Sequence, residues 1–339
     1  MKNLTYLLIA LINWSCIQNS NTEKYQTNRD NINNVHDKIK EIKIEDVLIS
    51  RSCKLQEVGD YLIIGDYKSP DKLIHIFTKN DFRYITSTAY LGQGPGEIAN
   101  MGYIGSDETD HFFVSDHGKQ KIFSYDLDSI LMHPSYEPKV KMKINKKLFP
   151  DSYKYINDTL CIGRIIEPTG SYGYKQSIAK WNMETGEIVP MKYEHPDIEK
   201  KRTVFAVSTK DNIYVECYHY HDLITICALD GTLLYNIYGP KWNSETSNKV
   251  FYYGNVAICS NHIFISYSGE TTFIKSQDGA VKSNLPTKLL IFDMNGNYIK
   301  TLETGYKIID FCYDSQNKRV IMNFNDDIQF GYLEIDKII

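Results

Sequence analysis

Two histidines separated by a single residue are the most specific candidate for a functional site in this sequence of 339 residues. They stand in Tyr218-His219-Tyr220-His221. On a β-strand, His219 and His221 would share one face, and two imidazoles at that spacing can bind a metal ion. The alternative is a polar hairpin turn with solvated histidines, and it is favoured because no third ligand stands nearby. The sequence therefore assigns no metal ligand here.

Charged groups also stand at the ends of short apolar runs. Asp116 and His117 follow the run FFVS, and Arg164 interrupts CIGRII. A side chain at the end of a strand either contacts a ligand or stabilises its own turn. Asp116, His117 and Arg164 are therefore ligand-binding candidates, with turn stabilisation as the alternative for each.

Two loops add further candidates. Glu97 ends the segment GQGPGE, where it either contacts a ligand or accepts hydrogen bonds from loop N–H groups. Residues 239–254 carry Trp242, Tyr252 and Tyr253. Exposed aromatic rings can stack on sugars or anchor a partner protein, whereas buried ones cover the core.

Signatures of common enzymes are absent from the sequence. There is no G-x-S-x-G, no H-E-x-x-H, no P-loop and no EF-hand loop. We assign no catalytic residue and lean against an enzyme.

Composition describes an ordinary globular chain. Hydrophobic residues make up 42% and charged residues 24%, and the formal net charge is -4. The weakly acidic balance, with no basic stripe, argues against nucleic acid as a partner. Tyr is abundant, with 26 residues against 14 Phe, which favours β structure.

These candidates must be positioned by strands, because no convincing long helix follows residue 40. A module of strand, polar turn and second strand recurs, as in DHFFVSDHGKQKIFSYDL from Asp110 and DNIYVECYHYHDLITICALDG from Asp211. A further apolar strand precedes each copy and another usually follows. Four strands per unit, repeated about every 40–55 residues, indicate a β-propeller, and six units fit after residue 50.

The last unit runs out of chain after its third strand. IKEIKIEDVLI, residues 39–49, alternates correctly and is predicted to supply the missing outer strand. We therefore expect an all-β, six-bladed propeller of four-stranded blades over residues 39–339, closed by an N-terminal strand. GQGPGE lies where the chain crosses from the outer strand of one blade to the inner strand of the next, and its glycines supply backbone freedom.

The segment G-x-G-P-G-E, followed by FFVSDHGKQKIFSYD, resembles NHL-type repeats. Over roughly residues 40–339 the chain resembles the TolB-like six-bladed propeller lipoproteins of Bacteroidota-type envelopes. The resemblance implies a single propeller domain and does not imply an activity.

The N-terminus has the pattern of a targeting segment. Lys2, an apolar run and then Cys16 resemble a bacterial lipoprotein signal, with residues 1–15 removed and Cys16 lipidated. An ordinary secretory signal cut nearby is the alternative. Residues 16–38 are polar and Asn-rich and are predicted to be a flexible tether. The six other cysteines stand mostly in apolar runs and are expected to be buried, with no disulfide framework.

These observations lead to a binding or scaffolding propeller of the cell envelope. A lipid would anchor it, in the outer membrane by our expectation, as a monomer. Its axial face or rim loops would engage a protein, peptide or glycan. The alternative is a metal-dependent hydrolase or lyase with its site in the axial channel. We expect no cofactor, although a divalent metal in that channel stays open.

Overall fold

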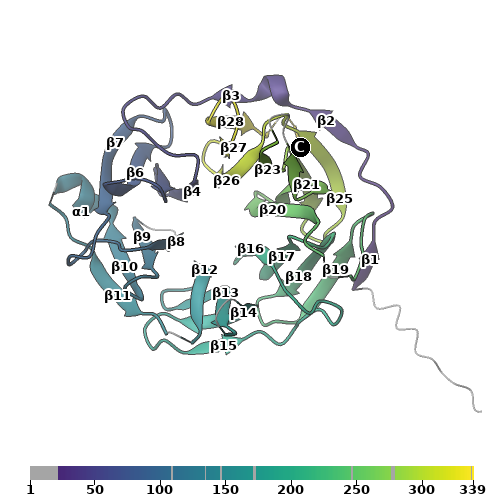
Figure 1. Ribbon diagram of the computed structural model, residues 1–339, viewed down its shortest axis with the longest axis horizontal. Coiled ribbons are helices and arrows are strands. Elements are labelled where there is room, and N and C mark those ends of the chain that lie inside the picture. The colour runs from purple at the N-terminus through teal and green to yellow at the C-terminus, as the bar shows by residue number, and fades with distance from the viewer. Residues whose placement is uncertain are drawn as a thin grey trace, which may run out of the picture.

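Short strands pair with their neighbours in the sequence to form six radial sheets around a central axis (Figure 1). The computed structural model describes residues 22–107, 110–133, 135–145, 147–170, 173–245, 247–275, 279–336 and 338–339. The sheets are the blades of a six-bladed β-propeller, as the repeat in the sequence predicted. Cys16 and the predicted signal segment lie outside the described residues.

The first three blades contain four antiparallel strands each, and in each blade the first strand is the inner one. Blade 1 contains β4 (Cys53–Val58), β5 (Tyr61–Asp66), β6 (Lys72–Thr78) and β7 (Tyr84–Tyr90). Blade 2 contains β8 (Met101–Ser106), β9 (His111–Asp116), β10 (Lys121–Asp126) and β11 (Lys139–Lys143), with the short helix α1 (Leu127–Met132) before its last strand. Blade 3 contains β12 (Phe149–Tyr155), β13 (Leu160–Pro168), β14 (Tyr174–Asn182) and β15 (Ile188–Pro190).

The remaining blades each receive a strand from the N-terminal part of the chain. Blade 4 contains β16 (Thr203–Ser208), β17 (Ile213–Tyr218), β18 (Leu223–Ala228), β19 (Leu233–Tyr238) and the added β1 (Glu23–Tyr25). Blade 5 contains β20 (Val250–Cys259), β21 (His262–Thr271), β24 (Lys288–Asp293), β25 (Tyr298–Glu303) and the added β2 (Ile32–Asn34). A separate hairpin of β22 (Phe273–Lys275) and β23 (Val281–Ser283) is inserted after the second strand of this blade. Blade 6 contains β26 (Ile308–Asp314), β27 (Arg319–Phe324), β28 (Phe330–Glu334) and β3 (Lys40–Glu41).

Closure of the ring follows the prediction. Strand β3 pairs antiparallel with β28, with Glu41 opposite Gly331 and Lys40 opposite Tyr332. The Ile42 N–H extends the pairing by donating to the Phe330 carbonyl at 2.9 Å. The strand is shorter than the alternating segment 39–49, but it covers the edge that blade 6 would otherwise expose.

The prediction of a flexible tether is wrong for residues 22–38. This segment, together with the β3 strand that follows it, forms a strap along the outer rim of blades 4, 5 and 6 (Figure 1). β1 pairs parallel with β19, and β2 pairs parallel with β25. A short 3₁₀ turn, His36–Lys38, then leads into β3. The polar composition misled the prediction because these strands bind through their backbones.

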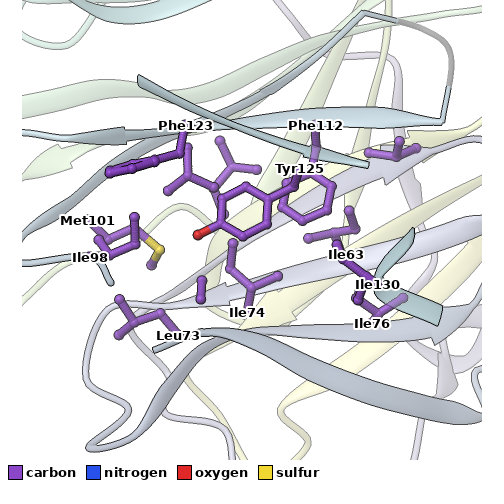
Figure 2. Packing of buried hydrophobic residues seen from close by; sticks show 14 of the residues in the cluster. Ile63, Leu73, Ile74, Ile76, Ile98, Met101, Phe112, Phe123, Tyr125 and Ile130 are labelled. Atoms are coloured by element: carbon purple, nitrogen blue, oxygen red, sulfur yellow. The ribbon is translucent and has the colours of Figure 1, made fainter. Parts of the chain in front are cut away.

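The apolar core lies between successive blades. Figure 2 shows the cluster between blades 1 and 2, where Phe112 and Tyr125 stack with ring centroids 4.9 Å apart. Ile63 and Ile74 of blade 1 pack in the same cluster and are fully buried. Stacking of adjacent blades thus buries side chains that one sheet alone would expose.

Within the described residues, no helix is long and apolar enough to span a membrane. The six cysteines in this part of the chain are free thiols, five of them buried. They behave as the small hydrophobic side chains that the sequence predicted. Burial raises the pKa of the Cys227 thiol to about 12.

Candidate axial binding site

The inner strands of all six blades line a central cavity of about 1270 Å³. We call the end at which the inner strands begin the axial mouth. There the inner strand of each blade also lies beside the end of its own second strand, as with Ser152 opposite Arg164. Three of the predicted site residues line the cavity: His117, Arg164 and His219.

A ring of side chains joins successive blades at the axial mouth. In blade 1 the Tyr67 hydroxyl donates to the Gly102 carbonyl of blade 2 at 2.8 Å. Arg164 donates to the Thr203 carbonyl of blade 4. The remaining bridges are His219 Nδ1 to the Tyr253 carbonyl at 2.6 Å, Asn255 Nδ2 to the Ile309 carbonyl at 3.2 Å and Asn323 Nδ2 to the Arg51 carbonyl at 3.0 Å. Each bridge ends on main chain within the first four residues of the next inner strand or, for Arg51, two residues before that strand.

His117 occupies the corresponding place between blades 2 and 3 but makes no such bridge. Its ring packs edge-on against Phe149 with centroids 5.5 Å apart. Its buried Nε2 has no hydrogen-bond partner among the described residues. The ring fits because residue 102 is glycine: a Cβ there would lie 2.4 Å from Nε2.

Charged side chains at the axial mouth are paired and held from several sides. Lys54 Nζ lies 3.0 Å from Asp310 Oδ1 and donates to Asn255 Oδ1 at 3.3 Å. The other Asp310 oxygen accepts from the Leu55 N–H at 2.7 Å. Arg164 Nε donates to Asp151 Oδ2 at 2.8 Å. Such pairs fix the geometry of the mouth while leaving little net charge there.

The protonation of His219 is set by its neighbours. Burial of the ring lowers its pKa to about 4, and the nearby cations Arg164, Lys54 and Arg202 act in the same direction against the bond to the Tyr253 carbonyl. A carbonyl oxygen can only accept, so Nδ1 carries the proton. Nε2 is therefore an unprotonated acceptor on a ring that lines the cavity. The ring is held flat against Phe251, with centroids 5.3 Å apart and planes 18° apart.

His221 does not join His219. Strand β17 ends at Tyr218, so both histidines lie in the turn, where the alternating geometry of a strand no longer applies. His221 is buried, bonds through Nδ1 to the Asn243 carbonyl at 3.1 Å and packs against Trp242. Among the described residues no three His, Cys, Asp or Glu side chains gather as a metal site would require.

Asp116 stabilises a loop. Its carboxylate accepts hydrogen bonds from four backbone N–H groups, those of Ala99, Asn100, Gly118 and Lys119, at 2.8–3.1 Å. It thereby ties the crossing loop before β8 to the turn after β9. Asp66 does the same in blade 1, where it accepts from the Ser50 N–H at 2.8 Å and the Lys68 N–H at 2.9 Å.

Glu97 also serves its own loop. Its Oε2 accepts from the Gly94 N–H at 2.6 Å. Lys119 then donates to the carbonyl oxygens of Gly94 and Glu97 at 2.6 and 2.7 Å. The structure therefore favours the loop-stabilising alternatives for Glu97 and Asp116.

The aromatic side chains Trp242, Tyr252 and Tyr253 pack inside the rim. Tyr252 and Tyr253 are buried, and Trp242 lies edge-on against Tyr238 with centroids 4.8 Å apart. Tyr252 and Tyr253 belong to the apolar cluster between blades 4 and 5, and Trp242 packs against the cluster of Tyr218, Leu223 and Tyr238 in blade 4, which is the core-covering arrangement. Phe251, from the same segment, stacks on the ring of His219, which lines the cavity.

Sequence reasoning missed Lys54, Asp151, Asn255 and Asp310. It searched crossing loops and the turns after second strands, whereas Lys54, Asp151 and Asp310 stand near the beginnings of inner strands and Asn255 stands in the middle of β20. A sequence pattern could have identified them, because a polar residue early in the first strand of a blade lies at the same mouth as the end of the second strand. The ion pair between Lys54 and Asp310 could not be predicted, because the two residues are 256 positions apart in the sequence.

The fold and the lined cavity define a six-bladed β-propeller with an axial site. Residues 22–162 match the family model DUF5128, described as a 6-bladed beta-propeller. No curated protein matches the sequence.

Several solved structures share the fold. A member of the DUF4221 family from Bacteroides vulgatus has 10% identity and a TM-score of 0.55, over 87% of this chain and 94% of that one. A candidate exported protein of Bacteroides fragilis has 10% identity and a TM-score of 0.51, over 89% and 87%. The calcium-binding protein regucalcin of Agrobacterium tumefaciens has 10% identity and a TM-score of 0.53, over 92% and 95%. At this identity the likeness establishes the fold alone.

Proposed function

We propose that this protein is a binding propeller of the cell envelope that takes a protein, peptide or glycan segment at its axial mouth. The observation that carries the proposal is the cavity of about 1270 Å³ whose mouth bears fixed polar groups. Arg164 and His219 each make one bond that holds the side chain to the next blade. Side chains held in this way lose little further freedom on binding, which favours affinity.

A filled cavity tests this proposal. Ala206 lines the cavity on β16 and is partly exposed, so Ala206→Trp should obstruct it. Val189 lies on the outer strand of blade 3 and is 53% exposed, so Val189→Trp adds the same ring far from the axis. We expect ligands found on peptide and glycan arrays to be retained by wild type and Val189→Trp and lost by Ala206→Trp. Equal binding by all three proteins would exclude the axial site.

The proposal also includes the location of the protein in the cell. A lipid on Cys16 would hold the propeller at a membrane, in the outer membrane by our proposal and as a monomer, in keeping with the resemblance to TolB-like lipoproteins. A neighbour in fold is itself a candidate exported protein, which supports an envelope location. Multiple acyl chains anchor firmly where one does not. Cys16→Ser should therefore move the protein from the membrane fraction to the soluble fraction, and continued sedimentation with membranes would contradict the anchor.

A metal-dependent hydrolase or lyase is the alternative function. In the part of the chain that the structure describes, no three His, Cys, Asp or Glu side chains form a group that could hold a metal ion. Elemental analysis of the purified protein addresses this alternative directly, and a stoichiometric divalent metal would reopen it.

A further inference from the structure

We infer that the axial mouth binds a neutral oligosaccharide. The inference rests on the proposed function and narrows the class of its ligand. Three features of the cavity carry it: the compensation of its charges, the division of its walls into polar and apolar sides, and the fixed acceptor on His219.

Charge compensation argues against a strongly ionic ligand. The described lining residues include five cations, Lys54, Lys79, Lys154, Arg164 and Lys210, and four anions, Glu57, Asp151, Asp211 and Asp310. Three of these pairs are in direct contact: Lys54 with Asp310 at 3.0 Å, Arg164 with Asp151 at 2.8 Å and Lys79 with Glu57 at 2.5 Å. At the axial mouth the charged lining residues are those of the first two pairs, whereas Lys154, Lys210 and Asp211 stand toward the opposite end of the cavity. A phosphate, a carboxylate or an ammonium group bound at the mouth would therefore have to break one of these two pairs to find its own counter-charge. An uncharged ligand would not.

The walls of the cavity differ in polarity. Blades 4 and 5 present partly exposed apolar side chains from β16 and β20: Val204, Phe205, Ala206, Val207, Val256, Ala257 and Ile258. Blades 1, 3 and 6 contribute the paired charges at the mouth. A pyranose ring has the matching character, since its C–H groups can lie against an apolar surface while its hydroxyls point outward. The cavity exceeds the roughly 300–1,000 Å³ of ordinary small-ligand pockets, so several rings can enter.

The cavity lining offers both hydrogen-bond donors and a hydrogen-bond acceptor. A hydroxyl donates one hydrogen bond and accepts others. His219 Nε2 offers an acceptor because Nδ1 is committed to the Tyr253 carbonyl. Arg164 and Lys54 offer N–H donors on the same lining, and each is already oriented by a carboxylate. A sugar hydroxyl can satisfy both kinds of group without bringing a charge.

Two variants of His219 distinguish its contribution to ligand binding from its contribution to stability, because each keeps only one of the two hydrogen-bonding positions of the ring. His219→Asn keeps a donor near the position of Nδ1, so the bond to Tyr253 survives, and removes the acceptor at Nε2. His219→Gln places an amide oxygen near Nε2 and loses the bond to Tyr253. His262→Asn, outside the cavity lining at the start of β21, is the matched control.

The probes are neutral oligosaccharides of three to six residues, glycans of the same length that carry uronic acids, and a pool of peptides, all measured by calorimetry. We expect a neutral oligosaccharide to bind wild type and His262→Asn equally and His219→Asn about tenfold more weakly. His219→Gln should bind nearly as wild type although it unfolds more readily. Phe205→Leu, which removes a ring from the apolar wall, should also weaken binding.

The outcomes distinguish the inference from the proposed function. If only acidic glycans or peptides bind, and Ala206→Trp blocks them, the saccharide inference is wrong and the axial site stands. If a neutral oligosaccharide binds equally to wild type, His219→Asn and Ala206→Trp, both are wrong. Absence of binding by every neutral oligosaccharide at millimolar concentration overturns the inference.

Discussion

Arg29 of the N-terminal strap forms a buried ion pair with Asp222 of blade 4, with Nη1 3.0 Å from Oδ1 and side chains exposed by 7% and 0%. The Tyr253 hydroxyl of blade 5 completes the cluster: it donates to Asp222 at 2.5 Å and accepts from Arg29 at 2.9 Å. The strap therefore supplies the cation for a carboxylate at an interface between blades. Tyr253 also links this cluster to the axial mouth, because its carbonyl accepts from His219.

Arg29→Met is expected to destabilise the protein by about 3–5 kcal/mol, because it leaves the Asp222 carboxylate buried without its partner. Arg29→Met combined with Asp222→Asn removes the stranded charge and should recover part of that loss. Urea unfolding of the three proteins measures both effects. Unfolding of Arg29→Met at the wild-type urea concentration would show that the ion pair adds nothing to stability.

Truncation tests the strap as a whole. A chain that begins at residue 22 keeps every contact described above, whereas one that begins at residue 39 loses β1, β2 and Arg29. We expect the second chain to lose at least as much stability as Arg29→Met and to aggregate through the exposed edges of blades 4 and 5. Size-exclusion chromatography and thermal unfolding compare the two. Equal behaviour would restore the interpretation of residues 22–38 as a tether.

The architecture was predictable because a propeller repeats its information. Six copies of strand, turn and strand fixed the fold, and the missing last strand pointed to residues 39–49. Arg29 could not be placed in the same way. Its neighbours are polar and Asn-rich, and nothing local shows that its partner is Asp222, 193 positions along the chain. The mouth posed the same difficulty: Lys54 meets Asp310 only because the ring closes.

The crossing loop GQGPGE now gives different expectations for its two inner glycines. Gly96 has φ of +72°, so Gly96→Val should destabilise by roughly 1–3 kcal/mol. Gly94 has no positive φ, and a Cβ there would lie 2.9 Å from the movable end of Glu97, so Gly94→Ala should cost less. Glu97→Gln should be mild, because an amide oxygen can still accept from the Gly94 N–H. Thermal unfolding ranks the three variants, and a Gly96→Val protein as stable as wild type would contradict the strained crossing.

His219 predicts how stability depends on pH. Its pKa in the folded protein is about 4, below the ordinary 6.5, chiefly because the ring is buried. Between about pH 6.5 and pH 4 the His219 side chain is protonated in the unfolded chain but mostly neutral in the folded protein, so acid favours unfolding over this interval. The stabilisation is therefore complete above pH 6.5 and is lost progressively between pH 6.5 and 4.

His219→Asn removes this titration while keeping a donor to the Tyr253 carbonyl, so its unfolding free energy should fall less steeply over that interval. Burial also lowers the pKa of His75, His195 and His221, so the variant should retain part of the slope. Urea unfolding at half-unit steps from pH 7.5 to 4 gives the two curves, with His262→Asn as the control. Their difference isolates His219 because the other three histidines titrate in both proteins. Parallel curves would mean that His219 accepts a proton as readily folded as unfolded, and its Nε2 would then be no fixed acceptor at the axial mouth.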